Sequence, residues 1–197
     1  VITLVVVGGW AFARWLVSRD ALKLPTAKTI GAAVVVVMTL ALMTATHERN
    51  SDYRSELAIW QDTVDKSPNS YRACNNLGDA LQHENQFAEA IPWHERTVQL
   101  KPSYATGHYD LAVALMRVGQ QDRALAEYRE TLKYKPLMPL AHNNLATILE
   151  ARGQINEAIA HYREAVRLDS GLVSAWGNLG RILLDHNQYE EAAKCYE

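Results

Sequence analysis

Apolar, small and polar residues recur along the last three quarters of the chain with a fixed period. Proline marks the period most plainly, because Pro68, Pro102 and Pro136 are spaced 102 − 68 = 34 and 136 − 102 = 34 residues apart. Between these prolines the same kinds of side chain return at the same positions of each unit. We number the positions from the first residue of each unit, and these first residues are Tyr71, Ala105, Pro139 and Val173.

Each unit keeps its largest and smallest side chains at the same positions. Leu occupies positions 7 and 11, Gly or Ala occupies position 8, Ala occupies position 20 and a ring occupies position 24. The Leu residues at position 7 are followed directly by the small ones, namely Gly78, Ala112, Ala146 and Gly180. The rings at position 24 are His94, Tyr128, Tyr162 and Tyr196. Position 4 is large in most units and holds Cys74, His108, His142 and Trp176.

The spacing of these positions predicts two helices in every unit. Positions 4, 7, 8 and 11 fall on one face of a helix, and positions 20, 24 and 27 fall on one face of a second helix. Gly or Ala at position 8 is expected to face Ala at position 20, so that the two helices approach closely. A single hairpin cannot bury its apolar face, so neighbouring hairpins must stack into a solenoid. The turn within each hairpin is predicted at Asn85, Gly119, Gly153 and Asn187.

This pattern resembles the tetratricopeptide repeat family over about three quarters of the chain, from about Ser51 to Glu197. Four residues depart from the family pattern: Cys74, His108 and His142 replace a Trp, and Ser170 replaces the closing Pro. The resemblance implies an all-α fold, a right-handed α-solenoid, and a scaffold that binds a protein or peptide partner. The expected organisation is a single capping helix in 51–70, followed by repeats at 71–104, 105–138, 139–172 and, truncated, 173–197.

The first fifty residues have a different composition. Residues 1–17 are apolar apart from Arg14, and residues 29–46 contain no charged side chain. At 1.5 Å per residue the second run would be roughly 27 Å long, which matches the hydrocarbon thickness of a bilayer. We therefore predict two transmembrane helices, with residues 18–28 as a basic loop between them. A buried soluble helix and a signal peptide with Lys23 and Lys28 as its basic region are the alternatives.

Charge predicts how such spans would be oriented. Residues 1–50 carry five basic and two acidic side chains, a balance of +3, and the remaining residues carry 15 basic and 20 acidic side chains, a balance of −5. Arg14, Arg19, Lys23 and Lys28 gather in or beside the loop, so the positive-inside rule places the loop in the cytoplasm. The protein is then an integral membrane protein with its repeats on the non-cytoplasmic side. The acidic repeat region lacks the basic footprint that nucleic acids require.

The junction between the apolar region and the repeats carries a second resemblance. An apolar run, the polar stretch from Arg49 to Tyr53, a lone helix containing Trp60 and then Asn75-Asn76-Leu77-Gly78 is similar to the C-terminal part of membrane glycosyltransferases of the protein O-mannosyltransferase type. The resemblance implies a preceding many-spanning core that uses a lipid-linked sugar. The chain begins without Met and ends inside a repeat, so we expect it to be a fragment.

A column of polar residues runs along the first helices at position 6. It resembles the asparagine ladder in the repeats of O-GlcNAc transferase, and an amide can both donate to and accept from the main chain of an extended peptide. The alternative is that these are solvated polar residues on a helix. We predict a peptide-binding groove with this column as Asn76, Asp110, Asn144 and Asn178. Its flanking residues are Arg72, Asp79, Arg117, Thr147 and Arg181.

Residues with catalytic or metal-binding chemistry show no recognised arrangement in the sequence. There is no Walker loop, Gly-x-Ser-x-Gly or Cys-x-x-Cys motif, and the seven His residues are expected in core or surface roles. Cys74 and Cys195 lie more than three repeats apart, which makes a disulfide between them implausible. We predict no catalytic residue, no metal and no cofactor. Two hypotheses remain: a membrane-anchored interaction module, and the tail of a glycosyltransferase whose repeats recruit the acceptor protein.

Overall fold

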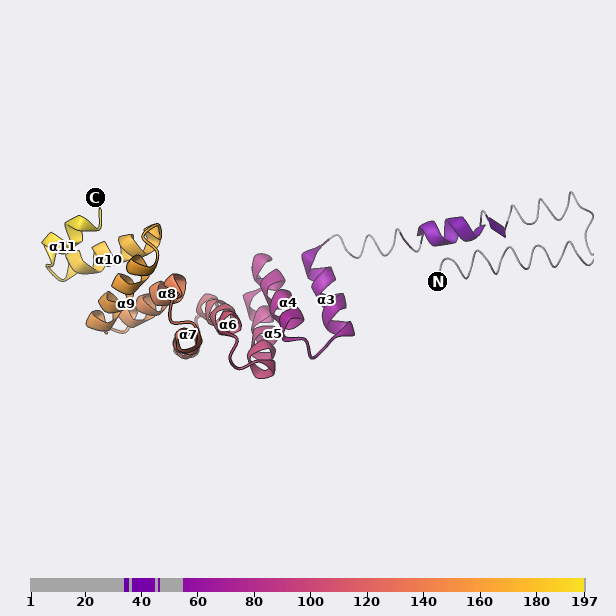
Figure 1. The fold of residues 1–197 in the computed structure, drawn as a ribbon, viewed down its shortest axis with the longest axis horizontal. Coiled ribbons are helices and arrows are strands. Elements are labelled where there is room, and N and C mark those ends of the chain that lie inside the picture. Colours follow the sequence, from indigo (N-terminus) through magenta and orange to yellow (C-terminus); the bar gives the residue numbers. More distant parts are fainter. Residues whose placement is uncertain (1–33, 36, 45, 47–54, 197) are drawn as a thin grey trace, which may run out of the picture. The chain divides into compact units, whose positions relative to one another are not determined.

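The computed structural model describes residues 34–35, 37–44, 46 and 55–196 (Figure 1). The chain divides into two compact units, Val1–Ser55 and Glu56–Glu197. In the first unit the described residues 34–35, 37–44 and 46 are helical. The predicted span 1–17 and the loop 18–28 lie outside the described residues, as does part of the predicted span 29–46. Among the residues that the structure does describe, none of the helices combines the length and apolarity needed to cross a bilayer.

The second unit consists of helices joined by short turns, and the prediction of an all-α solenoid is confirmed. Each helix packs against the next one along the chain, from α3 to α11. The first helices of the four repeats are α4 (Tyr71–His83), α6 (Ala105–Arg117), α8 (Pro139–Ala151) and α10 (Val173–Asp185). The second helices are α5 (Phe87–Leu100), α7 (Gln121–Tyr134), α9 (Ile155–Leu168) and α11 (Tyr189–Lys194). They are preceded by α3 (Glu56–Lys66).

A left-handed residue ends the first helix of every repeat. Gly119 and Gly153 have φ angles of 80° and 73°, and Asn85 and Asn187 have φ angles of 61° and 62°. The residue after each of them is Gln, and its backbone N–H donates to the carbonyl of the Leu at position 11, at 2.8 to 2.9 Å. This closure satisfies carbonyl groups that the helix end would otherwise leave unpaired. The predicted turns are therefore built by one shared backbone motif.

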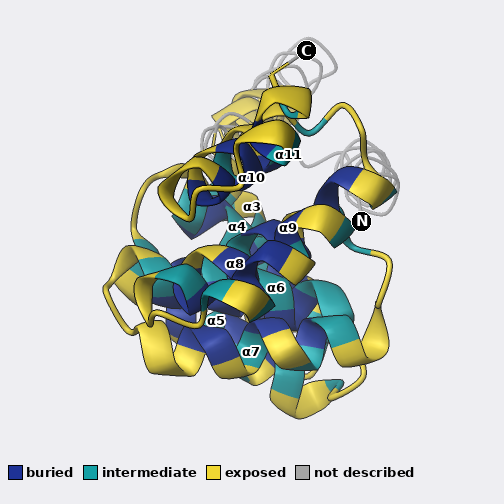
Figure 2. Cartoon of the chain, turned by 90° about the vertical axis from the view of Figure 1, so that its left-hand side faces the viewer, coloured by how far each residue is buried: buried dark blue, intermediate teal, exposed yellow. Residues whose placement is uncertain are grey.

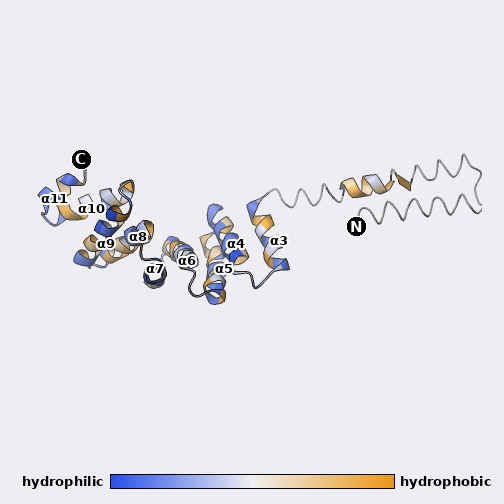
Figure 3. Cartoon of the chain, viewed as in Figure 1, coloured by the Kyte–Doolittle hydropathy of each residue, from blue (hydrophilic) through white to orange (hydrophobic). Residues whose placement is uncertain are grey.

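The core runs through the middle of the stacked hairpins, and polar residues cover their outer surfaces (Figures 2 and 3). The Leu residues at positions 7 and 11 and the Ala residues at position 20 are buried in all four repeats. Tyr128 and Tyr162 at position 24 are also buried, with 1% and 0% of their surface exposed. Because the same positions are buried in each repeat, a single continuous core joins repeats two to four.

The small residue at position 8 lies beneath the ring at position 24. A Cβ atom added to Gly78 would lie 2.5 Å from the His94 ring, and one added to Gly180 would lie 2.5 Å from the ring of Tyr196. Position 8 was expected to face Ala at position 20, but the nearest neighbours of both glycines are these rings. The ring is larger than Ala and lies flat against the facing helix, so it needs the space that a missing or small side chain leaves.

The helix α3 covers one side of the first repeat. Leu57 and Trp60 pack against the buried cluster of this repeat, which α3 itself joins through Val64. The same cluster includes Leu77 and Ala90, one from each helix of the hairpin. Without α3 the apolar face of the first hairpin would have no neighbour on this side, so α3 acts as the N-terminal neighbour that each other repeat obtains from the preceding one.

Two Gly→Ala substitutions should have effects of opposite sign on stability. Gly119→Ala places a Cβ at a φ angle of 80°, and we expect it to lower the free energy of unfolding by about 1–2 kcal/mol. Gly177 lies within α10, and a Cβ added to it meets no atom within 4 Å. We expect Gly177→Ala to raise the free energy of unfolding by about 0.5–1 kcal/mol, because Gly loses more backbone entropy than Ala in a helix. Urea unfolding followed by circular dichroism measures both. Equal changes in the two variants would contradict the assigned turn.

Candidate functional site

The predicted groove residues all lie on the first helices of the repeats. These helices form one side of the stack, where α4 contacts α6 and α8 contacts α10 directly. The side chains at position 6 and Asp79 are half-buried, whereas Arg72, Arg117, Thr147 and Arg181 are exposed. The structure thus brings the predicted residues onto one surface, which we call the inner surface. Its chemistry depends on which of these side chains are already engaged within the protein.

A ladder of hydrogen bonds connects successive repeats along the inner surface. Each rung joins position 5 of one repeat to position 6 of the next, two residues that are 35 apart in the sequence. The rungs are Asn75 Nδ2 to Asp110 Oδ2 at 3.1 Å, Asn144 Nδ2 to the Tyr109 hydroxyl at 3.4 Å, and Asn178 Nδ2 to Asn143 Oδ1 at 3.1 Å. Position 6 therefore has a role within the protein that the sequence analysis did not foresee, because it holds adjacent repeats in register.

Asn144 is the most heavily bonded member of this ladder. Its Nδ2 also donates to the hydroxyl of buried Tyr128 at 3.2 Å, and its Oδ1 accepts from Asn143 at 3.2 Å. The side chain of Asn76, at the same position of the first repeat, has no hydrogen bond among the described residues. In the described repeats, position 6 bonds to position 5 of the preceding repeat. The helix before α4 is α3, which has no residue equivalent to position 5 that could pair with Asn76. Its amide is consequently the position-6 amide with the greatest freedom to meet a partner.

Position 12 provides a second connection between repeats. Glu150 accepts two hydrogen bonds from the Arg181 guanidinium at 2.6 and 2.9 Å, and another from the Tyr162 hydroxyl at 3.0 Å. The bond from Arg181 lowers the pKa of Glu150. In the first repeat Gln82 donates to the Asp110 carbonyl at 3.1 Å. Arg181 was predicted as a groove residue, and the structure shows that Glu150 fixes its guanidinium in place.

The two other predicted arginines lie over aromatic rings. The guanidinium carbon of Arg72 is 5.6 Å from the centre of the Tyr71 ring, and that of Arg117 is 5.1 Å from the centre of the Phe87 ring. Neither arginine is ion-paired with a carboxylate among the described residues. The rings orient the side chains and leave most guanidinium N–H groups toward solvent. Arg72 and Arg117 can therefore donate to carbonyl or carboxylate groups of a ligand.

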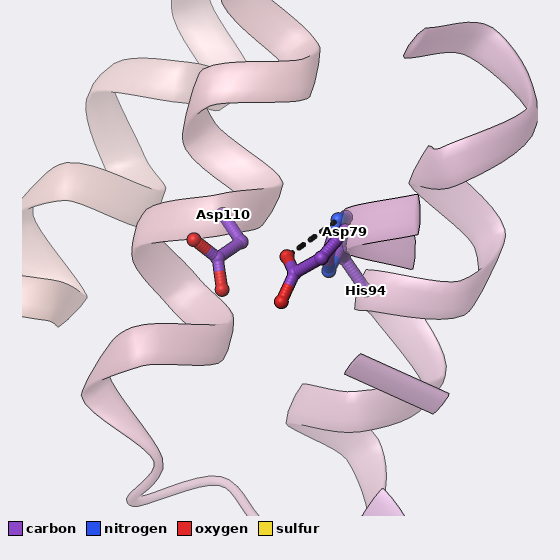
Figure 4. A group of neighbouring side chains, drawn as sticks. All are labelled: Asp79, His94 and Asp110. Carbon is purple, nitrogen blue, oxygen red and sulfur yellow. Dashed lines mark ion pairs between the residues drawn. The ribbon is translucent and has the colours of Figure 1, made fainter. Parts of the chain in front are cut away.

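Asp79, His94 and Asp110 form a cluster that the sequence analysis missed. One ligand atom from each lies within 4.8 Å of the others (Figure 4). Burial raises the pKa of Asp79 to about 6, and burial together with the neighbouring Asp79 raises that of Asp110 to about 7. Burial lowers the pKa of His94 to about 4. The sequence contains a signal of this cluster. At position 24 the first repeat has His94 where the others have Tyr, and at position 6 the second repeat has Asp110 where the others have Asn.

A pair of histidines lies between the two helices of the third repeat. The Nδ1 atoms of His142 and His161 are 2.9 Å apart, and each His lies on a different helix of the third repeat. Burial lowers the pKa of His161, and charge on His142 lowers it further. His142 Nε2 donates to the Pro136 carbonyl at 2.9 Å, and the tautomers of the two rings decide which Nδ1 donates to the other. Within the described residues no third ligand-type side chain joins this pair.

Models of one protein family match the repeats at three places along the chain. Three models described as tetratricopeptide repeat match residues 72–101, 109–173 and 173–197. A curated relative, the protein O-mannosyl-transferase Tmtc3 of Drosophila melanogaster, is 29% identical over 80 residues. That match covers 41% of this chain and spans only 8% of the length of the relative.

Solved structures show the same fold. MamA of Desulfovibrio magneticus RS-1 superposes with a TM-score of 0.65 at 18% identity, covering 81% of this chain and 89% of the other. YrrB, described as a TPR protein with an unusual peptide-binding site, superposes with a TM-score of 0.61 at 17% identity, covering 79% of this chain and 78% of the other. At these identities the likeness concerns the fold alone.

The ladder predicts that two asparagines at equivalent positions differ in their effect on stability. Asn144→Ala leaves the buried Tyr128 hydroxyl without its donor, and we expect a loss of about 1–3 kcal/mol in the free energy of unfolding. Asn76→Ala removes a side chain without a hydrogen bond in the described part of the chain, and we expect a change within about 0.5 kcal/mol. Urea unfolding of both variants checks this. Similar losses would show that the ladder does not hold the repeats.

Proposed function

We propose that this chain, which belongs to the tetratricopeptide repeat family, binds an extended peptide or a partner protein on its inner surface. The observation that carries the proposal is the placement of Arg72 and Arg117, whose exposed guanidinium groups lie on the inner surface and are held by rings instead of carboxylates. YrrB, described as having a peptide-binding site, supports this use of the fold. Fold alone does not determine function, so the argument depends on these side chains.

The pattern of engaged and free groups defines how a ligand would be held. Asn144, Asn178 and Arg181 already bond to neighbouring repeats, so they form a polar part of the surface whose side chains are held in place. Asn76, Arg72 and Arg117 lie on the first two repeats and supply donors; Arg72 Nε already donates to the Tyr71 hydroxyl at 3.1 Å, but neither arginine has an ion pair among the described residues. A ligand with backbone carbonyls or acidic side chains complements such donors. We therefore infer that the N-terminal half of the inner surface provides most of the binding energy.

Binding can be tested with peptides selected against the whole chain. A displayed library of random peptides yields a ligand, and its affinity is then measured by isothermal titration calorimetry. We expect Arg72→Ala and Arg117→Ala each to weaken binding by about tenfold, because each removes a charged donor worth about 1.4 kcal/mol. The matched control is Arg129→Ala on the second helix α7, where Arg129 pairs with Glu157 on the surface. Equal losses in all three variants would contradict the inner surface as the site.

We further propose that residues 29–46 anchor the repeats to a membrane. Support comes from the absence of charge in this run and from the hydrogen bonds of its described hydroxyl groups. Thr39, Thr44 and Thr46 donate to backbone carbonyls three or four residues earlier, at 2.6 to 2.9 Å. Such bonds allow Thr to enter an apolar surrounding without an unpaired donor. The basic residues of the preceding loop favour a non-cytoplasmic location for the repeats.

Membrane anchoring is tested by expressing the chain with residues 1–50 and, as a control, without them. We expect the longer form to stay in the membrane fraction after alkaline carbonate extraction and the shorter form to be released. Protease added to intact vesicles of known orientation then reports which side the repeats occupy. Release of the longer form by carbonate would contradict the anchor.

The similarity to Tmtc3 favours a second candidate function. In this alternative, the chain is the C-terminal part of a membrane-embedded glycosyltransferase, and the repeats position the acceptor protein. The full coding sequence distinguishes the two candidates. Many further apolar spans before Val1, with paired acidic residues in an extracytoplasmic loop, would support the enzyme. A start codon close to Val1 would support a small anchored scaffold.

A further inference from the structure

The junction between the first two repeats holds a group of three ligand-type side chains, and no other junction within residues 55–196 holds such a group. Asp79 comes from α4, His94 from α5 and Asp110 from α6, and the two carboxylates face each other across the gap between α4 and α6 (Figure 4). His94 Nε2 lies 4.0 Å from Asp79 Oδ1. Three helices from two repeats thus direct two oxygen ligands and one nitrogen ligand toward a common point.

The charge at this junction is not balanced by the protein. Neither carboxylate pairs with a Lys or Arg in the part of the chain that the structure describes. A single neutral amide, Asn75 Nδ2, donates to Asp79 at 2.9 Å and to Asp110 at 3.1 Å. Two carboxylates this close are unfavourable when both are ionised, so the site needs a proton or a cation between them. The neighbouring charges on α3 and α4 are Glu56 and His83, which act on Asp79 in opposite directions.

Two polar atoms at the cluster are buried without partners, and both belong to side chains that touch it. His94 is 0% exposed and its Nδ1 has no hydrogen bond, and Asn75 is 3% exposed and its Oδ1 has none. An unpaired buried polar atom is costly, which points to a function or a missing ligand. Rotation of the Asn75 amide by 180° would exchange Nδ2 for Oδ1 against the carboxylates. That arrangement is favourable only if a cation is coordinated by Asn75 Oδ1 and by one oxygen of each carboxylate.

We propose that Asp79, His94 and Asp110, assisted by Asn75 Oδ1, bind one divalent transition-metal ion such as Zn²⁺ or Mn²⁺. Two carboxylates and an imidazole suit these ions, whereas Ca²⁺ and Mg²⁺ prefer oxygen ligands alone. The lone pair of His94 Nε2 can bind the ion once Gln82 Nε2, now 2.7 Å away, moves aside. The bound ion would join the first repeat to the second.

The other junctions of the same chain show what the site looks like without ligands. Where the first junction has Asp79, His94 and Asp110, the second has Val113, Tyr128 and Asn144, and the third has Thr147, Tyr162 and Asn178. None of these six residues is a carboxylate or an imidazole. The proposal therefore predicts a stoichiometry of one ion per chain and identifies a conservative variant, because Asp110→Asn introduces the residue that the other three repeats carry at position 6.

The test titrates Zn²⁺ and Mn²⁺ into the metal-free full chain without an affinity tag, using calorimetry and thermal unfolding. We expect one ion to bind with a rise in the unfolding temperature, and Asp79→Asn and Asp110→Asn each to weaken binding by about tenfold to a hundredfold. Asp122→Asn, which changes an exposed carboxylate paired with Arg152, should leave binding unchanged. Circular dichroism confirms that each variant is folded.

Two results would overturn the metal site. One is the absence of saturable binding of either ion at concentrations up to about 1 mM, which corresponds to less than about 4 kcal/mol of binding free energy. The other is binding that persists unchanged in both Asp→Asn variants, since it would place the ion elsewhere, for example at His142 and His161. Neither result depends on whether the inner surface binds a peptide. The metal site is therefore tested independently of the proposed function.

Discussion

Burial of the apolar face of each hairpin against its neighbours is the constraint on which the repeat unit depends. The Leu residues at positions 7 and 11 are buried in all four repeats, and the ring at position 24 is buried in the first three, only because the adjacent helices cover them. One hairpin alone would expose these side chains, and no long-range contact replaces the neighbour. The same constraint explains α3, which covers the first hairpin with Trp60 and Val64. Stability therefore resides in the interfaces between hairpins as much as in the hairpins themselves.

The inner surface shows how polar groups adapt to that stacking. Close approach of the first helices half-buries position 6, so amides there must find partners. Asn144 and Asn178 find them on the preceding repeat, and Asp110 finds Asn75. The groups that remain available to a ligand are then few and unevenly distributed. They gather on the first two repeats, where Asn76 lacks a preceding partner and two arginines rest on rings.

Sequence periodicity was sufficient for the fold, and it was insufficient for the contacts on the inner surface. A period of 34 residues specifies which faces are apolar and where a left-handed turn residue falls, so the helices and turns could be predicted. It does not specify which amide meets which, because the ladder joins position 5 to position 6 across repeats and depends on the offset between stacked helices. The cluster of Asp79, His94 and Asp110 was not predicted from the sequence for the same reason. Its members are conspicuous only once α4, α5 and α6 are placed together.

The central claim is that position 5 of one repeat and position 6 of the next bond to each other and hold the stack in register. A double-mutant cycle on Asn143 and Asn178, whose side chains are 3.1 Å apart, measures this bond directly. The variants Asn143→Ala, Asn178→Ala and the double variant are compared by urea unfolding. The account predicts a favourable coupling energy of about 0.5–1.5 kcal/mol. A coupling energy within about 0.3 kcal/mol of zero would mean that the two side chains act independently, and it would contradict the ladder.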